Sequence, residues 1–111
     1  MENELGKKTC VPCKKGVAPL KGESIQNLLK RLNEGWQVVE ERYLEKEYLF
    51  SDFQEALEFA NRIGEIAEVE SHHPDLYLSY GKLKVQLWTH KIEGLSENDF
   101  ILAAKCDLLK R

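Results

Sequence analysis

The first periodic pattern along the chain places apolar residues at helical spacing, at Ile25, Leu28, Leu29 and Leu32. The pattern begins at Ser24 and is followed by Gly35, a residue type that commonly ends helices, so it predicts a short amphipathic helix. Residues 36–41 and 42–50 are instead rich in aromatic, branched and other large apolar side chains. Their lengths and composition favour an antiparallel pair of strands over one long helix.

A longer apolar stripe of helical period follows these strands and consists of Phe53, Ala56, Leu57, Ala60, Ile63 and Ala67. Ser51 and Gln54 have the spacing of a capping box at its start, and we expect this helix to end near His72. Near the C-terminus, Ser96 and Asp99 form a similar N-cap pair ahead of another apolar stripe, which predicts a last helix.

Between the two longer helices, residues 76–80 and 83–90 alternate apolar and polar side chains on either side of a Gly-Lys dipeptide. A glycine in the first central position suits a two-residue type II′ turn, which predicts a hairpin that pairs Tyr80 with Leu83. Continued along the ladder, this register brings His90 to the level of His73. One face of the hairpin is then apolar and the other is polar.

The order of the expected elements is helix, two strands, long helix, two strands and helix. This order favours an α+β fold with two layers, in which three helices cover one face of a four-stranded antiparallel sheet. Residues 1–22 precede the periodic patterns and combine lysines, glycines and prolines, which predicts an extended leader over the surface. We expect residues 23–111 to form a single domain.

The leader contains two closely spaced cysteines, in the segment CVPC at residues 10–13. A zinc site would need a second pair of ligands, which Cys106 alone does not supply, and a redox motif would open a helix after a strand. Two reduced cysteines at the surface are therefore the favoured interpretation. Zinc held jointly by two subunits, with one cysteine pair from each, is the alternative.

Charge and hydropathy narrow the range of partners. The chain has 16 Lys and Arg against 19 Asp and Glu, a formal net charge of -3, so it lacks the basic excess on which non-specific nucleic-acid binding relies. It has no apolar run of the length of a membrane span, and its start lacks the apolar region of a signal peptide. We therefore expect neither a nucleic-acid nor a membrane partner, and a cytoplasmic location.

The candidate chemistry lies in the segment EVESHHP at residues 68–74, which places His72 and His73 side by side at a helix end before Pro74. Glu68 and His72 are four residues apart, so the carboxylate can orient the imidazole if the helix persists that far. The expected hairpin delivers His90 to the same end. Three converging imidazoles are typical of a proton-transfer site.

Metal binding is the first alternative for such a cluster, since histidine is a frequent zinc ligand. Adjacent histidines rarely direct both rings at one ion, and this favours a site without metal, although Glu68 and His72 do have a ligand-like separation.

Trp88 shares the strand face of His90. It is expected either to wall a pocket for a flat ligand or to take part in simple packing or a subunit contact.

These residues resemble the signature of the pterin-4a-carbinolamine dehydratase family. That signature is an acidic residue, His-His-Pro after three residues, an aromatic residue, a histidine that ends the next strand and a later aspartate. The matching residues here are Glu68, His72, His73, Pro74, Tyr80, His90 and Asp99. The resemblance covers about residues 20–111, and the antiparallel sheet with helices on one face that it implies agrees with the pattern.

The resemblance also implies an activity. The family consists of hydro-lyases that remove water from 4a-hydroxytetrahydropterin to give quinonoid dihydropterin, in the recycling of tetrahydrobiopterin, with no metal or other cofactor. The implied residues are the catalytic His72, His73 and His90, the orienting Glu68 and Asp99, and the substrate-binding Trp88 and Pro74. A homodimer or homotetramer is implied as well. A non-catalytic binding or assembly module of the same fold is the alternative.

Overall fold

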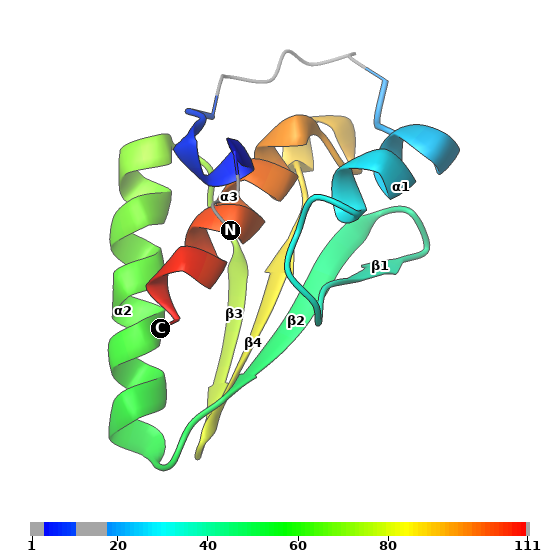
Figure 1. Ribbon diagram of the computed structural model, residues 1–111. Coiled ribbons are helices and arrows are strands. Elements are labelled where there is room, and N and C mark those ends of the chain that lie inside the picture. The colour runs from blue at the N-terminus through cyan, green and yellow to red at the C-terminus, as the bar shows by residue number, and fades with distance from the viewer. Residues whose placement is uncertain (1–3, 11–17, 111) are drawn as a thin grey trace.

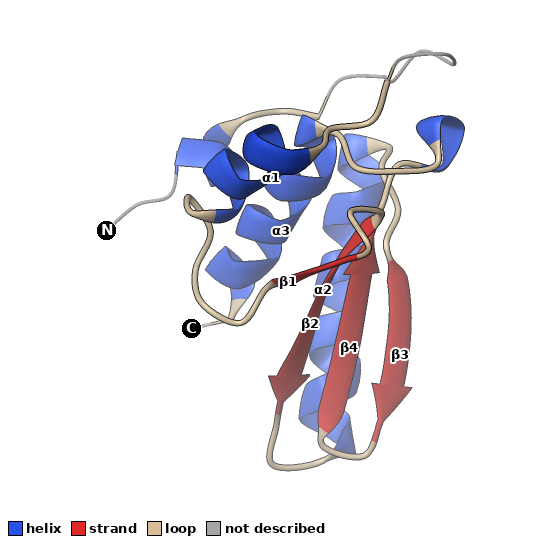
Figure 2. Ribbon diagram, turned by 90° about the vertical axis from the view of Figure 1, so that its right-hand side faces the viewer, coloured by secondary structure: helices blue, strands red, loops and turns tan. Residues whose placement is uncertain are grey.

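The computed structural model describes residues 4–10 and 18–110. Its elements are η1 (Glu4–Lys7), α1 (Gly22–Leu29), β1 (Gln37–Val39), β2 (Tyr43–Leu49), α2 (Phe53–Glu70), β3 (Asp75–Ser79), β4 (Lys82–Leu87), η2 (His90–Ile92) and α3 (Glu97–Leu109), where η marks a 3₁₀ turn. Helices α2 and α3 lie on one face of the sheet, and α1 packs beside α3 on the same side (Figures 1 and 2). This arrangement confirms the predicted two-layer α+β fold.

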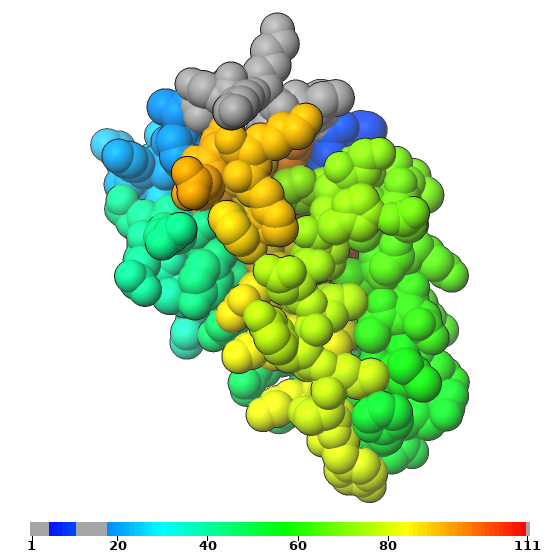
Figure 3. Space-filling view, turned by 180° about the vertical axis from the view of Figure 1, so that it is seen from behind, coloured from blue at the N-terminus to red at the C-terminus, as the bar shows by residue number. Residues whose placement is uncertain are grey.

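The sheet has four antiparallel strands in the order β1-β2-β4-β3. Alternation along the central strand β4 buries Leu83, Val85 and Leu87 beneath the helices and turns the polar residues between them to the other face. The helices leave that second face uncovered, and Figure 3 shows β3 and β4 in yellow at its surface. The site of interest lies beyond the end of β4.

The hairpin of β3 and β4 exists, but its register differs from the prediction by two residues. Ser79 pairs with Lys82, so the two-residue loop is Tyr80-Gly81 and the glycine occupies the second central position. Gly81 has φ +68, a conformation that glycine adopts without the steric cost of a side chain. A shift of two residues keeps every side chain on its predicted face. The ladder between β3 and β4 ends at the pair Asp75 and Gln86, so it does not reach His90, which belongs to η2 instead.

The caps of the two long helices decide where the site residues emerge. The N-cap of α2 is Asp52 rather than Ser51: its side chain accepts a hydrogen bond from Glu55 N at 2.9 Å. At the other end, α2 stops at Glu70 because Ser71 takes a left-handed conformation with φ +54. The predicted N-cap pair of α3 is present, since Asp99 Oδ2 accepts from the backbone N–H of Ser96 at 2.9 Å.

The N-terminal segment is not the extended leader that its composition predicts. Residues 4–7 form η1, and Leu5 is 0% exposed within the hydrophobic core. Gly6 allows this turn to approach α3 closely, because a Cβ there would lie 2.6 Å from Leu108 Cδ1. Cys10 and Cys106 are free thiols, whereas Val11, Pro12 and Cys13 lie outside the described residues.

A buried carboxylate ties the sheet to α3. Asp107 accepts hydrogen bonds from Trp36 Nε1 at 2.9 Å, from the Tyr48 hydroxyl at 2.6 Å and from Lys46 Nζ at 2.7 Å. Lys46 points from β2 toward the helices and lies 4.9 Å from the centre of the Tyr48 ring, within reach of a cation–π interaction. These contacts give a buried charge the partners it needs.

Within the two described ranges, no helix combines the length and the apolar character that crossing a membrane requires.

We expect Tyr48→Phe to lower the free energy of unfolding at neutral pH by about 2 kcal/mol, because it removes a hydrogen bond to a buried carboxylate. Urea denaturation followed by circular dichroism measures the loss. The matched control is Tyr80→Phe, at a position that is 74% exposed, and it should leave the free energy of unfolding unchanged.

The effect of this substitution should also depend on pH. Burial, and after it the nearby Cys106 and Asp107 side chains, raises the pKa of Tyr48 above the ordinary tyrosine value of 10.0. Above that pH the unfolded wild-type chain releases a proton that the folded protein retains, which stabilises the unfolded state. The difference in stability between the wild type and Tyr48→Phe should therefore narrow as pH rises above 10.0. A constant difference would contradict this interpretation.

Candidate functional site

A cavity of about 490 Å³ lies where the C-terminal end of α2 meets the end of β4 and the start of α3. This volume is typical of a site for a small molecule. Its lining residues are Thr9, Cys10, Val69, Glu70, Ser71, His72, His73, Trp88, Thr89, His90, Lys91 and Asn98. The structure therefore brings all three histidines to one cavity, although His90 arrives through η2 rather than through the hairpin ladder.

His72 is held by Asp99, not by Glu68. Its Nε2 atom lies 2.6 Å from Asp99 Oδ1, and the imidazole is only 12% exposed. The predicted contact with Glu68 is wrong because α2 ends two residues before His72, at the left-handed Ser71. The helical spacing of four residues therefore does not extend to this histidine, which turns toward the start of α3.

Glu68 pairs with His73 instead. Its Oε2 atom contacts His73 Nε2, and both side chains are largely exposed, so this ion pair contributes little to stability. Pro74 follows immediately and leads into β3. Neither Glu68 nor Pro74 lines the cavity.

Asp99 is the centre of a buried hydrogen-bond network. It is 0% exposed, and its Oδ2 atom accepts from the Thr89 hydroxyl at 2.8 Å and from Ser96 N at 2.9 Å, which leaves Oδ1 to His72. The Thr89 and Ser96 hydroxyl oxygens are also 2.7 Å apart. One carboxylate thus caps α3 and fixes an imidazole at the cavity wall.

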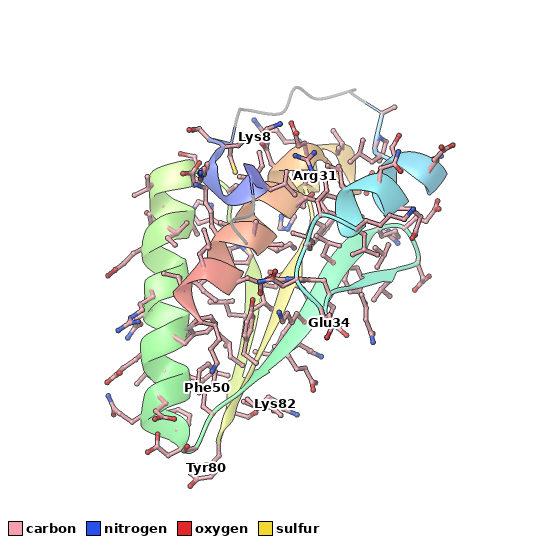
Figure 4. All side chains as sticks on the ribbon, viewed as in Figure 1. Lys8, Arg31, Glu34, Phe50, Tyr80 and Lys82 are labelled. Carbon is pink, nitrogen blue, oxygen red and sulfur yellow. The ribbon has the colours of Figure 1, made fainter. Side chains whose placement is uncertain are left out.

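Trp88 and His90 lie against one another just after the end of β4. Their ring centroids are 4.0 Å apart, and the indole is fixed by a hydrogen bond from Trp88 Nε1 to Asp75 Oδ2 at 3.1 Å. Both residues line the cavity, so Trp88 offers a flat aromatic surface beside an imidazole. Tyr80, which also matches the family signature, lies at the hairpin tip, at the opposite end of the molecule from Lys8 (Figure 4).

Sequence reasoning missed several residues of the site. Thr89 directly precedes His90 in the sequence, and that position was the available signal. Only the structure shows that its hydroxyl contacts the capping box of α3. Thr9 and Cys10 come from the N-terminal segment and gave no periodic signal. Burial, and then the Glu70 carboxylate, raises the pKa of Cys10 to about 12, so its thiol stays protonated at neutral pH.

The arrangement suits proton transfer. Imidazole exchanges protons near neutral pH, and the three rings differ in surroundings: one bound to a buried carboxylate, one to an exposed carboxylate and one against an indole. Among the residues that the structure describes, no three His, Cys, Asp or Glu side chains are grouped so as to hold a metal ion.

Comparisons with known proteins point to one family. The sequence model of the family Pterin 4 alpha carbinolamine dehydratase matches residues 18–109. A Rubrobacter xylanophilus protein with the provisional name pterin-4-alpha-carbinolamine dehydratase is 50% identical over 107 residues, which are 96% of this chain and 99% of that protein. A Rickettsia bellii protein with the same provisional name is 53% identical over 106 residues, covering 96% of this chain and 94% of that protein.

A solved structure agrees with these sequence relatives. The crystal structure of a transcriptional coactivator/pterin dehydratase from Brucella melitensis superposes with a TM-score of 0.77 at 29% identity, covering 82% of this chain and 97% of that one.

We expect Thr89→Val to lower the free energy of unfolding by about 2 kcal/mol, because it leaves the buried Asp99 carboxylate without one of its donors. Thr89→Ser keeps the hydroxyl and should recover most of the loss. Thr9→Val is the matched control at an exposed threonine and should change little. Equal stabilities of Thr89→Val and Thr89→Ser in urea denaturation would show that the hydrogen bond to Asp99 is unimportant.

Proposed function

Because this chain belongs to the pterin 4 alpha carbinolamine dehydratase family and is thus an enzyme of the hydro-lyase class, we propose that it dehydrates 4a-hydroxytetrahydropterin by histidine acid–base catalysis. The observation that carries the proposal is the gathering of His72, His73 and His90 around one cavity. Recycling of tetrahydrobiopterin and a cytoplasmic location belong to the same proposal.

The reaction needs two proton transfers at neighbouring atoms. The bond from C4a to its hydroxyl oxygen breaks as that oxygen receives a proton and leaves as water. N5 gives up its proton, and the double bond between C4a and N5 forms quinonoid dihydropterin. One group must donate and another accept, and an imidazole side chain can serve either purpose.

The geometry limits how each histidine acts. Nε2 of His72 is bound to Asp99 and Nε2 of His73 to Glu68, so in both rings Nδ1 is the nitrogen left for another partner. Asp99 orients His72 from inside the protein, while Glu68 orients the more exposed His73. His90 supplies the third imidazole from η2, beside Trp88.

Trp88 is the candidate for binding the pterin ring. Its indole lines the cavity and is fixed by Asp75, so it offers a rigid flat surface on which a bicyclic ring stacks. Pro74 supports the site indirectly, since a proline restricts the backbone of the preceding His73 to an extended conformation.

A non-catalytic binding or assembly module is the competing function. The Brucella melitensis structure is described as both a transcriptional coactivator and a pterin dehydratase, which gives this alternative a specific basis. A turnover assay with 4a-hydroxytetrahydropterin separates the two functions, because only the enzyme accelerates the loss of water.

We expect His72→Ala and His90→Ala each to lower turnover by about 10²- to 10⁴-fold, because each removes a positioned proton donor or acceptor. The double variant should lose much less than the product of the single losses, since the residues act as a unit. Stopped-flow measurement of dihydropterin formation gives these rates. Full activity of His90→Ala would overturn the proposed role of the cluster.

Two controls accompany these variants. Tyr80→Phe changes the signature aromatic residue at the hairpin tip, outside the cavity, and should retain wild-type turnover. Dialysis of the wild type against a chelator should also leave turnover unchanged, because no step of the proposed mechanism uses a metal ion.

We expect the protein to form a homodimer or homotetramer, as the family resemblance implies. The sheet face that carries Lys84, Gln86 and Trp88 is not covered by the helices and is available for a subunit contact (Figure 3). Light scattering at micromolar concentration should give a mass of at least twice the 12.9 kDa of one chain. A monomeric mass would contradict this prediction.

A further inference from the structure

The N-terminal segment, residues 4–10, is fastened to the body of the protein although the family model matches only from residue 18 onward. Leu5 anchors it in the core between fully buried neighbours. Lys105 Nζ of α3 donates to Gly6 O at 3.0 Å, and Lys8 Nζ lies 2.8 Å from Glu97 Oε2. In Figures 1 and 4 this segment lies beside the C-terminal end of α2.

Among the contacts that hold the N-terminal segment to the body of the protein, that of Glu70 with Cys10 lies at the cavity itself. Glu70 Oε1 accepts a hydrogen bond from the backbone N–H of Cys10 at 2.8 Å, and its Oε2 atom lies 3.7 Å from Lys105 Nζ. The carboxylate is 10% exposed, so both oxygens are committed to the protein rather than to water. The Cys10 thiol lies 3.7 Å from the carbonyl oxygen of Asn98 at the start of α3.

These contacts hold Thr9 and Cys10 at the cavity that also contains the three histidines. Glu70, Asn98 and the two N-terminal residues all contribute to its lining, and none of them belongs to the histidine cluster or to its carboxylate partners. The cavity is therefore lined by two groups of residues. One contains the candidate catalytic histidines, and the other belongs to the N-terminal segment, which precedes residues 18–109 matched by the family model.

We propose that Thr9 and Cys10 form a substrate-contacting wall of the pterin site and that Glu70 is the positioning residue that holds this wall in place. The inference rests on the proposed function. Because the wall contains none of the three histidines, it acts on substrate affinity rather than on proton transfer. Fixing it before the ligand arrives also lowers the entropy lost on binding.

The test is the affinity for 7,8-dihydrobiopterin, which has a pterin ring but no 4a-hydroxyl group to lose, measured by isothermal titration calorimetry. Glu70→Ala frees Cys10 N and should weaken binding about tenfold, the equivalent of one hydrogen bond of 1.4 kcal/mol. Glu70→Gln retains an oxygen that accepts from Cys10 N and should recover most of the affinity. Glu65→Ala is the matched control, since Glu65 is an exposed glutamate of the same helix and lies outside this cavity.

The kinetic parameters provide a second readout. For Glu70→Ala we expect KM to rise about tenfold while kcat stays within about threefold of the wild type, since the histidines are untouched. Thr9→Trp places a bulky ring at an exposed position of the wall and should lower affinity by filling the cavity, with no change in Tm. If Glu70→Ala does not fold, Thr9→Trp decides the question alone.

The outcomes separate this inference from the proposed function. A wild type that turns over 4a-hydroxytetrahydropterin, together with wild-type affinity in both Glu70→Ala and Thr9→Trp, overturns the wall and leaves the dehydratase intact. A loss confined to kcat in Glu70→Ala overturns it as well, because Glu70 would then act on the chemistry. A wild type that neither binds dihydrobiopterin nor turns over the substrate overturns both proposals.

Discussion

The hydrogen bonds of the Asp99 carboxylate are the interaction on which the site depends. A buried charge is tolerated only where protein donors replace the lost water, and here the donors come from three places in the chain. Ser96 supplies the backbone N–H of a helix cap, Thr89 supplies a hydroxyl from the end of the sheet, and His72 supplies an imidazole from beyond α2. Stabilising this one charge therefore brings together the ends of a helix, a strand and a loop, and the cavity forms where they meet.

Helix α3 is fixed at both ends by the same principle. Near its C-terminal end, Asp107 binds Trp36, Lys46 and Tyr48, which come from β2 and the residue before β1. Between the two carboxylates the helix is buried along most of its length, so its position relative to the sheet is determined by polar contacts at the ends and by packing in between. The site inherits this rigidity, which acid–base catalysis requires because proton donors and acceptors must be held close to the reacting atoms.

The histidines and the N-terminal segment have separate parts in the proposed dehydratase. The imidazoles provide groups that exchange protons, each in a different environment, whereas the segment held by Glu70 provides shape. Lys105 links the two parts, since it contacts both Glu70 and the backbone of η1 from the buried helix.

The signature residues indicated the family, and local patterns in the sequence determined the longer helices and the strands, their order and the faces of the hairpin strands, because periodicity and capping act over a few residues. They also indicated that the three histidines lie together. Only the tertiary structure decided which side chains contact one another. Ser71 ends α2 in a left-handed conformation, so Asp99 rather than Glu68 holds His72. Gly81 occupies the second position of its turn, which moves the hairpin register by two residues. The burial of Leu5 and the contact of Cys10 with Glu70 join residues far apart in the chain, and such contacts leave no periodic trace in the sequence.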